Sequence, residues 1–240
     1  MVRWEETTAL ILAGGLGTRL RPVLTDRPKV LAPVAGRPFL EFLLDQLVST
    51  GIRDVVLCVG YGGAAIEATF GACYGPLRLR YSHEPQPLGT AGALAWARPL
   101  TRSDPVLVLN GDSYCELDPK AWGAWYTASA PAASILATFQ LDASRFGRVI
   151  FQPDGDIVRF EEKGASGPGW INAGRYLLSR TVLDSIPTGR AVSIERETFP
   201  AWVGRGLRAY PGGRRFLDIG VPESYAEAEA FFASRPPEAE

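Results

Sequence analysis

Three glycines stand close together near the start of the chain, where an apolar run ends at Ala13. This segment, Gly14–Gly17, is followed directly by Thr18 and Arg19. Glycines at a strand end let backbone N–H groups approach an anion, and an arginine can hold phosphate oxygens through two parallel N–H bonds. We therefore interpret residues 14–19 as a phosphate-binding loop with Arg19 as a phosphate ligand. A simple tight turn would explain two glycines, but not three with a Thr-Arg pair behind them.

Two common phosphate-binding loops differ from this one. The dinucleotide-binding turn G-x-G-x-x-G needs a third glycine where Leu20 stands, and Pro22 interrupts the helix that should follow. A P-loop needs a Gly-Lys-Ser/Thr sequence, which this chain does not contain. An NAD(P)-dependent oxidoreductase on a variant turn is therefore the disfavoured enzymatic alternative. A catalytically idle regulatory paralogue is the non-enzymatic one.

Lysine is scarce in this chain: of 25 cationic residues only three are lysines, at positions 29, 120 and 163. A compact ammonium and a planar guanidinium are not interchangeable, so the few lysines deserve a functional interpretation. Lys29 follows the glycine loop closely, where it can join Arg19 on a polyphosphate. Lys163 ends an acidic segment, and Asn172 stands shortly after it beside small residues, which suits a polyhydroxylated ligand.

Two aspartates occur in matching surroundings, each after an apolar strand and beside a glycine. Asp112 belongs to the segment "LNGDSY" and Asp218 to "FLDIG". Either one alone is typical of a turn. Together they indicate a Mg²⁺ site, because Mg²⁺ takes one or two carboxylates and completes its shell with water and phosphate oxygens.

The composition excludes several other classes. The 240-residue chain has a net charge of −1, which gives no reason to expect nucleic acid or an acidic membrane as a partner. Its three cysteines stand singly and it has one histidine, His83, which excludes a Cys/His zinc site and a disulfide framework. No G-x-S-x-G segment accompanies that histidine. No apolar run reaches the length of a membrane span, so we expect a cytoplasmic protein.

Strand and helix signals alternate in the first half. Strands are predicted at 8–13, 53–60, 77–84 and 105–112, and helices at 37–51, 64–71 and 90–100. Pro38 is expected in the first turn of helix 37–51, with Gly51 as its C-cap. Apolar strands separated by helices indicate a parallel sheet in an α/β fold. The ligand crevice then lies beyond the carboxyl ends of the strands, where residues 14–19, 84–92 and 110–112 are found.

The second half is rich in strands, predicted at 134–140, 148–152, 156–163, 170–179 and 208–220. Helices are expected at 180–185, 194–202 and 222–232. No Pro/Gly/Ser linker separates the halves, so we expect one domain, residues 1–234, with lobes at about 1–130 and 131–234 around a crevice. The tail 235–240 is expected to be flexible.

These motifs occur in an order that resembles the sugar-1-phosphate nucleotidylyltransferase family. The matching segments are "LILAGGLGTRLRP", "DRPKVLAPVAGRP", "EPQPLGTAGAL", "LNGD", "SRFGRV", "FEEK", "INAG" and "FLDIGVPESY", spread over nearly the whole chain. The resemblance implies a Rossmann-like fold with a mixed, mainly parallel sheet flanked by helices. It also implies a nucleotide-binding first lobe and a strand-rich, sugar-binding second lobe.

The resemblance implies roles for individual residues. It assigns Arg19, Lys29, Asp112 and Lys163 to catalysis and Asp112 and Asp218 to Mg²⁺. It assigns Gly147, Glu162 and Asn172 to the sugar. The nucleotide-binding set comprises Leu12, Ala13, Gly14, Gly15, Gly17, Thr18, Glu84, Leu88, Gly89, Thr90 and Gly111. His83 and the cysteines receive no catalytic role.

Within the family, the segment 88–93, "LGTAGA", looks like that of guanylyl members, whereas uridylyl members often carry histidine where Gly92 stands. Several segments look most like bacterial D-glycero-α-D-manno-heptose 1-phosphate guanylyltransferases, which implies a role in cell-surface polysaccharide synthesis. Mannose 1-phosphate as substrate, or uridylyl or thymidylyl transfer, stays open. Arg175 departs from the usual aliphatic residue, and we interpret it as a mark of an exposed strand face.

The implied reaction is in-line attack by the sugar phosphate on the α-phosphorus of GTP, with release of pyrophosphate. The nucleophile is already an anion at neutral pH, so no general base is required. Catalysis would then rest on positioning and charge stabilisation. GTP and a sugar 1-phosphate are the expected partners, without nucleic acid or membrane, and a homo-oligomer is compatible with the sequence.

Overall fold

The computed structural model describes residues 1–15, 17–20, 22–24, 27–164 and 166–234. The tail 235–240, expected to be flexible, lies outside them. Within these ranges no helix is long and apolar enough to cross a membrane.

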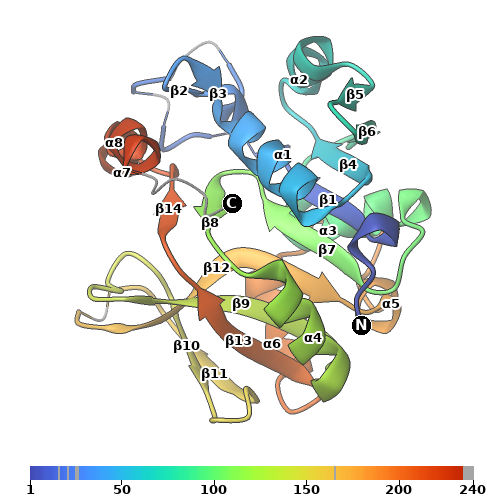
Figure 1. Ribbon diagram of the computed structural model, residues 1–240, viewed down its shortest axis with the longest axis vertical. Coiled ribbons are helices and arrows are strands. Elements are labelled where there is room, and N and C mark those ends of the chain that lie inside the picture. The colour runs from blue at the N-terminus through green and yellow to red at the C-terminus, as the bar shows by residue number, and fades with distance from the viewer. Residues whose placement is uncertain (16, 21, 25–26, 165, 235–240) are drawn as a thin grey trace.

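A ten-stranded sheet forms the centre of the molecule (Figure 1). Strands β1 (Thr8–Leu12), β4 (Asp54–Val59), β6 (Leu77–His83) and β7 (Val106–Asn110) lie in the order β7-β1-β4-β6 and run parallel. The short β5 (Cys73–Tyr74) pairs with the outer edge of β6. The parallel sheet predicted for the first half is thus confirmed.

The strand-rich half extends the same sheet rather than forming a separate one. β12 (Gly169–Leu178) pairs antiparallel with β7 on one side and with β9 (Ala133–Gln140) on the other. β13 (Leu207–Gly213) then adds parallel to β9, while β10 (Arg148–Phe151) and β11 (Ile157–Glu161) form an antiparallel extension beside β12. The expected mixed, mainly parallel sheet flanked by helices is therefore present.

Two small ribbons lie outside the main sheet. β8 (Ser113–Cys115) pairs antiparallel with β14 (Phe216–Asp218), which brings together segments about a hundred residues apart. β2 (Pro33–Val34) pairs with β3 (Arg37–Pro38) just before the first long helix.

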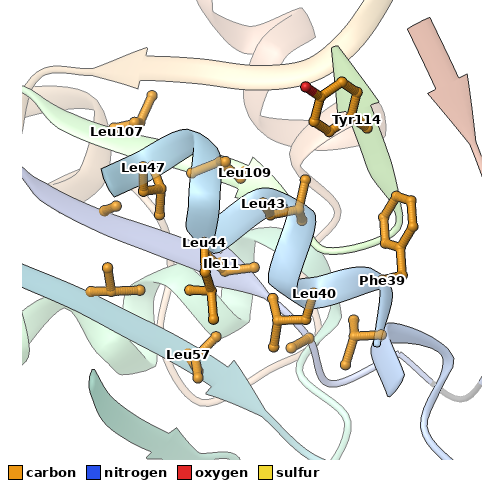
Figure 2. Close-up of a cluster of buried hydrophobic side chains, with 14 of the residues drawn as sticks. Ile11, Phe39, Leu40, Leu43, Leu44, Leu47, Leu57, Leu107, Leu109 and Tyr114 are labelled. Atoms are coloured by element: carbon orange, nitrogen blue, oxygen red, sulfur yellow. The ribbon is translucent and has the colours of Figure 1, made fainter. Parts of the chain in front are cut away.

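Helices cover both faces of the sheet, and each interface is a separate apolar core. On one face, α1 (Phe39–Thr50) places apolar residues at helical spacing against the parallel strands; Figure 2 shows Leu40, Leu43, Leu44 and Leu47 with Ile11, Leu57, Leu107 and Leu109. α2 (Gly63–Phe70) and α4 (Pro119–Ser129) contribute to the same core. α3 (Gly89–Ala97), α5 (Arg180–Asp184) and α6 (Phe199–Trp202) pack on the opposite face.

Several helix boundaries differ from the predicted ones. Pro38 is the N-cap of α1 rather than a first-turn residue, although Gly51 does end that helix at a φ of 91°. The predicted helix 222–232 is two helices, α7 (Pro222–Ala226) and α8 (Ala228–Ala233). The turn between them lets Phe232 of α8 stack on Phe42 of α1 with ring centroids 3.8 Å apart.

The remaining turns are short. In the described part of the chain, 3-10 helices occur at Trp4–Glu6, Lys29–Leu31 and Arg98–Leu100. The predicted helix 194–202 begins as a single π-helical turn, Ile194–Thr198, before it continues as α6. The interpretation of Arg175 as an exposed strand residue was wrong, because this side chain is 2% exposed.

Candidate active site

A cleft of about 280 Å³ opens where the parallel strands end. Seven of the predicted nucleotide-binding residues line it: Leu12, Ala13, Gly14, Gly15, Glu84, Gly89 and Thr90. Lys29 and Asp112 line the same cleft, as do Val30, Pro87, Ala93 and Asn110, which sequence reasoning did not select. The crevice predicted at the carboxyl ends of the strands is therefore present, and it collects residues from four segments far apart in the chain.

The three glycines of the loop after β1 are needed for three different reasons. A Cβ on Gly14 would lie 2.8 Å from Glu84 Oε1 and 2.9 Å from the backbone nitrogen of Gly60, so the turn passes too close to its neighbours for a side chain. Gly15 has no neighbouring atom within 4 Å of such a Cβ and faces open space in the cleft. Gly17 has a φ of +58°, which favours glycine. Of the three, Gly15 is therefore the position that leaves room for a ligand.

Hydrogen bonds of Gly111, Leu88 and Thr90, three of the predicted nucleotide-binding residues, support the segments around the cleft. Gly111 N–H donates to Leu12 O at 2.9 Å, and a Cβ there would lie 2.5 Å from that oxygen. Leu88 N–H donates to Glu84 Oε2 at 3.0 Å and so fixes the carboxylate that lines the cleft. Thr90 Oγ1 accepts the N–H of Ile194 at 2.8 Å, which ties the start of α3 to the π-helical turn.

Thr18 and Arg19 lie on the turn that follows the glycine loop. Both side chains are exposed and neither lines the cleft. The N–H of Leu20 donates to Gly17 O at 2.9 Å and the Leu20 side chain is buried, so the end of this turn is anchored in the protein. The structure thus places Arg19 on the turn directly after the predicted phosphate loop, outside the set of residues that line the cleft.

The two predicted metal-binding aspartates meet at the end of the β8–β14 ribbon. Ser113 is the register partner of Asp218, and its Oγ lies 3.1 Å from Asp112 Oδ1 and 3.3 Å from Asp218 Oδ2. Lys29 Nζ forms an ion pair with Asp112 Oδ2 at 2.6 Å, with the lysine side chain 11% exposed. The structure therefore brings together Lys29, Asp112 and Asp218, as the sequence analysis required.

The two carboxylates differ in their protonation chemistry. Burial alone would raise the pKa of Asp112, but the Lys29 ammonium and the hydrogen bonds outweigh it and hold that pKa below its ordinary value. Burial, followed by the negative charge of Asp112, raises the pKa of Asp218. Lys29 only partly offsets that shift. The ionised form of Asp218 is therefore disfavoured by burial and by the neighbouring Asp112 carboxylate.

The predicted sugar-binding residues lie on the strand-rich side. Asn172 Nδ2 donates to Tyr176 Oη at 3.0 Å and its Oδ1 accepts the N–H of Gly174 at 2.8 Å, so its amide is held in one orientation. Glu162 and Lys163 are exposed at the end of β11. Gly147 precedes β10, and a Cβ there would lie 2.8 Å from Glu161 O, so close strand packing already accounts for this glycine.

Glu195 belongs to this site and was missed by sequence reasoning. It lies on the π-helical turn, with Oε1 3.4 Å from Asn172 Nδ2. Burial raises its pKa, the nearby Lys163 opposes that shift, and the charges of Asp112 and Asp218 add to it. Its carboxylate therefore lies within the electrostatic influence of Lys163 and the aspartate pair. The sequence signal nearby was the helix start at Ser193, whose Oγ accepts the Arg196 N–H at 3.2 Å, while Glu197 Oε1 accepts the Ser193 N–H at 3.0 Å.

The histidine and cysteines take no part in the cleft. His83 Nε2 lies 3.0 Å from Glu67 Oε2 on an exposed surface. Cys58 and Cys115 are buried and Cys73 is exposed, all as free thiols. No group of three or more His, Cys, Asp or Glu side chains positioned for a metal occurs in the described part of the chain.

This fold and site define a nucleotidyl-transfer protein: a family model described as nucleotidyl transferase matches residues 8–235, and the chain belongs to that family. Among curated relatives, mannose-1-phosphate guanylyltransferase of Mycobacterium tuberculosis is 36% identical over 94% of this chain and 64% of its own length. The chain therefore spans slightly under two thirds of that relative. D-glycero-alpha-D-manno-heptose 1-phosphate guanylyltransferase of Campylobacter jejuni is 34% identical over 90% of this chain and 96% of its own.

A solved structure gives the same picture. The crystal structure of HddC from Yersinia pseudotuberculosis has a TM-score of 0.85 and 32% identity, over 94% of this chain and 99% of that one. The same protein complexed with GMP-PN has a TM-score of 0.82. The family resemblance and the fold predicted from the sequence are thus confirmed.

Proposed function

We propose that this protein is a guanylyltransferase that joins GTP and D-glycero-α-D-manno-heptose 1-phosphate to give a GDP-sugar and pyrophosphate. The observation that carries the proposal is the cleft that the glycine loop, Lys29 and Asp112 line, with Asp218 next to Asp112 through the Ser113 hydroxyl. Relatives named for this activity support the choice of sugar, and the HddC complex with GMP-PN supports the choice of nucleotide.

In the proposed reaction, a phosphate oxygen of the sugar 1-phosphate attacks the α-phosphorus of GTP. The new P–O bond forms as the bond to the bridging α,β oxygen breaks, and pyrophosphate leaves with that electron pair. The attacking oxygen carries negative charge near pH 7, so no side chain needs to remove a proton. Lys29 and Arg19, with Lys163 on the sugar side, reduce the repulsion between two polyanions and align them for in-line attack.

The acidic pair fits Mg²⁺. Asp112 and Asp218 both place a carboxylate oxygen within 3.3 Å of the Ser113 hydroxyl. Burial, and then the charge of Asp112, raises the pKa of Asp218, and Lys29 offsets this only in part. We propose that these two residues hold the ion while water and phosphate oxygens complete its shell. When bound, Mg²⁺ supplies charge stabilisation to the phosphates.

Glu84 supports guanine as the base. Its carboxylate lines the cleft beside Gly14 and is oriented by the Leu88 N–H at 3.0 Å. A carboxylate accepts hydrogen bonds only, which matches the adjacent N1–H and N2–H donors of guanine. Uracil and thymine present one N–H between two carbonyl oxygens, which a carboxylate repels. A uridylyl or thymidylyl activity is therefore the less favoured alternative.

On the sugar side, Asn172 and Glu195 offer a fixed amide and a carboxylate to hydroxyl groups. Mannose 1-phosphate is the second candidate, because a relative at 36% identity carries that name and the two sugars share the manno ring configuration. We further propose a cytoplasmic location, where GTP is available, and use of the product in cell-surface polysaccharide synthesis.

Pyrophosphate release over a matrix of substrates tests the proposal. GTP, ATP, UTP and dTTP are each combined with the 1-phosphates of the heptose, mannose and glucose, in Mg²⁺ with an EDTA control. We expect turnover with GTP and the heptose 1-phosphate that EDTA abolishes. No turnover with GTP would refute the choice of base, and turnover with mannose 1-phosphate alone would refute the choice of sugar.

A further inference from the structure

Arg175 is a buried cation outside the cleft. Its side chain lies in the apolar core on the α1 face of the sheet, 2% exposed, on the strand β12. Among the described residues it forms no ion pair with a carboxylate within 4 Å, and its Nε has no hydrogen-bond partner. The titratable groups that act on it are the Cys115 thiol and the Tyr114 hydroxyl, which are uncharged near pH 7. Burial lowers the pKa of this guanidinium.

The side-chain amide of Gln46 is the hydrogen-bond partner of the Arg175 guanidinium. Arg175 Nη2 donates to Gln46 Oε1 on α1, and Gln46 Nε2 donates to Cys115 O on β8 at 2.8 Å. Arginine has no acceptor atom, so it can face only the oxygen of the amide. Arg175 therefore fixes the orientation of Gln46 and directs its NH₂ group to the backbone of β8.

β8, the strand that Gln46 contacts, adjoins both aspartates of the acidic pair. β8 begins directly after Asp112, and its partner β14 ends at Asp218. Cys115 is the register partner of Phe216 at the opposite end of the ribbon from Ser113 and Asp218. The ribbon forms a two-stranded sheet of its own. The chain connects it to β7 through residues 111–112, and the Gln46 amide adds a side-chain link from α1 to the far end of β8.

We propose that Arg175 is a positioning residue that acts through Gln46. It holds the β8–β14 ribbon, and with it Asp112 and Asp218, at the distance from Lys29 and the glycine loop after β1 that the reaction needs. The proposal rests on the proposed function, because it assigns those aspartates to the reacting phosphates. Arg175 itself touches neither the cleft nor Asp112.

The stability of the folded state does not explain why the Arg175 guanidinium is buried here. A buried charge without a carboxylate partner disfavours the folded state, and apolar residues of similar volume often replace buried ionic groups without loss of stability. A residue that only packed the core would thus lower the melting temperature when replaced and reduce turnover in proportion. A positioning residue would reduce turnover while the melting temperature stays equal or rises.

Three variants separate these possibilities. Arg175→Met removes the donor to Gln46 and keeps the length of the side chain. Arg175→Lys retains a donor. Gln46→Glu pairs with Arg175 but loses the NH₂ group that binds Cys115 O. Arg37→Met is the control, since Arg37 bonds the outer side of the same helix through Glu41 and Asp45.

We expect kcat to fall by about tenfold to a hundredfold in Arg175→Met and Gln46→Glu, since a misplacement of roughly 1 Å has effects of that size. KM for both substrates should change less than kcat, the melting temperature should not fall, and Arg175→Lys should recover most of the rate. Arg37→Met should keep the wild-type kcat. Amide hydrogen exchange of residues 113–116 should accelerate in Arg175→Met relative to wild type.

A kcat within twofold of wild type in both Arg175→Met and Gln46→Glu would overturn the proposal. So would a loss of rate that follows the melting temperature and is not recovered by lysine. If Arg175→Met does not fold, Gln46→Glu decides alone, because it retains a partner for Arg175. If the wild-type protein turned over no nucleotide, the proposed function would fail. Hydrogen exchange of the β8–β14 ribbon would then still test whether Arg175 holds the ribbon through Gln46.

Discussion

Asp112 is the residue at which the charges of the cleft converge. It binds Lys29 Nζ at 2.6 Å and shares the Ser113 hydroxyl with Asp218. Asp112→Asn preserves the shape of the side chain but removes the charge that orients Lys29, so we expect kcat to fall on the order of 10²–10³-fold. Pyrophosphate release measures it, with Asp184→Asn on an exposed surface as control. Near-normal turnover of Asp112→Asn would remove this residue from the reaction.

Replacing Glu84 should stabilise the folded protein but weaken its recognition of guanine. Burial raises its pKa, and the Leu88 N–H only partly offsets that shift. A raised folded-state pKa means that ionised Glu84 costs folding free energy near pH 7, and that this cost disappears as the pH falls through the raised pKa. Glu84→Gln should therefore raise the melting temperature near pH 7 and also raise KM for GTP. Thermal denaturation and steady-state kinetics test the two effects separately.

The same residue predicts the pH dependence of nucleotide binding. As the pH falls, Glu84 gains a proton at a higher pH than an ordinary glutamate does and loses acceptor capacity for guanine. KM for GTP should therefore rise on acidification in the wild type, and that rise should be absent in Glu84→Gln. An identical pH profile of KM in both proteins would show that Glu84 does not read the base.

At the scale of single elements, the loop after β1 offers a matched pair of substitutions. Gly14→Ala places a methyl group 2.9 Å from a backbone nitrogen, so we expect about 1–3 kcal/mol of destabilisation from overpacking. That corresponds to roughly 2–4 °C in melting temperature for each kcal/mol. Gly15→Ala meets no atom within 4 Å, so its melting temperature should stay unchanged while KM for GTP rises. Equal effects of the two changes on stability would contradict this assignment of roles.

A substitution at Thr90, at the start of α3, should destabilise the π-helical turn Ile194–Thr198. Thr90→Val removes the acceptor of the Ile194 N–H, which lies 2.8 Å from Thr90 Oγ1. We expect a loss of about 1–3 kcal/mol because a backbone N–H loses its partner. We also expect a higher KM for both substrates, since Glu195 follows Ile194 on this turn. Thr90→Ser should restore both properties. If only KM for GTP changed, at constant melting temperature, Thr90 would act by direct contact instead.

Local patterns predicted the elements that local chemistry controls. The apolar strand ending at Ala13 and the C-cap Gly51 are explained by short-range periodicity and backbone conformation. α4 (Pro119–Ser129) was missed although its signal is present, since Asp118 caps it by accepting the Ala121 N–H at 3.0 Å and Pro119 occupies its first position.

Contacts between distant segments were less accessible to sequence reasoning. Asp112 and Asp218 could be paired because both stand in similar surroundings. Glu195 and Arg175 could not be placed, because one depends on a π-helical turn held by Thr90 and the other on an amide of α1. Burial of a charged residue in a strand depends on what packs over it, and sequence alternation does not contain that information.

At the scale of the whole molecule, one sheet joins the nucleotide and sugar sides. β12 carries Asn172 and Arg175, and it pairs directly with β7, which leads to Asp112. The cleft at the ends of β1 and β7 and the predicted sugar-binding residue Asn172 therefore belong to one continuous hydrogen-bonded sheet. In the proposed reaction, this continuity would give the two substrates the fixed relative position that an in-line displacement requires.

The continuous sheet also predicts cooperative unfolding. Leu44→Ala opens a cavity in the core under α1, and Ile135→Ala opens one in the core on the opposite face, both at fully buried positions. Each should cost about 2–5 kcal/mol. Because β7 and β12 connect the two halves, each variant should shift one calorimetric transition to lower temperature, with equal van't Hoff and calorimetric enthalpies. The halves would unfold independently if calorimetry resolved two transitions and Leu44→Ala shifted one of them while Ile135→Ala shifted the other.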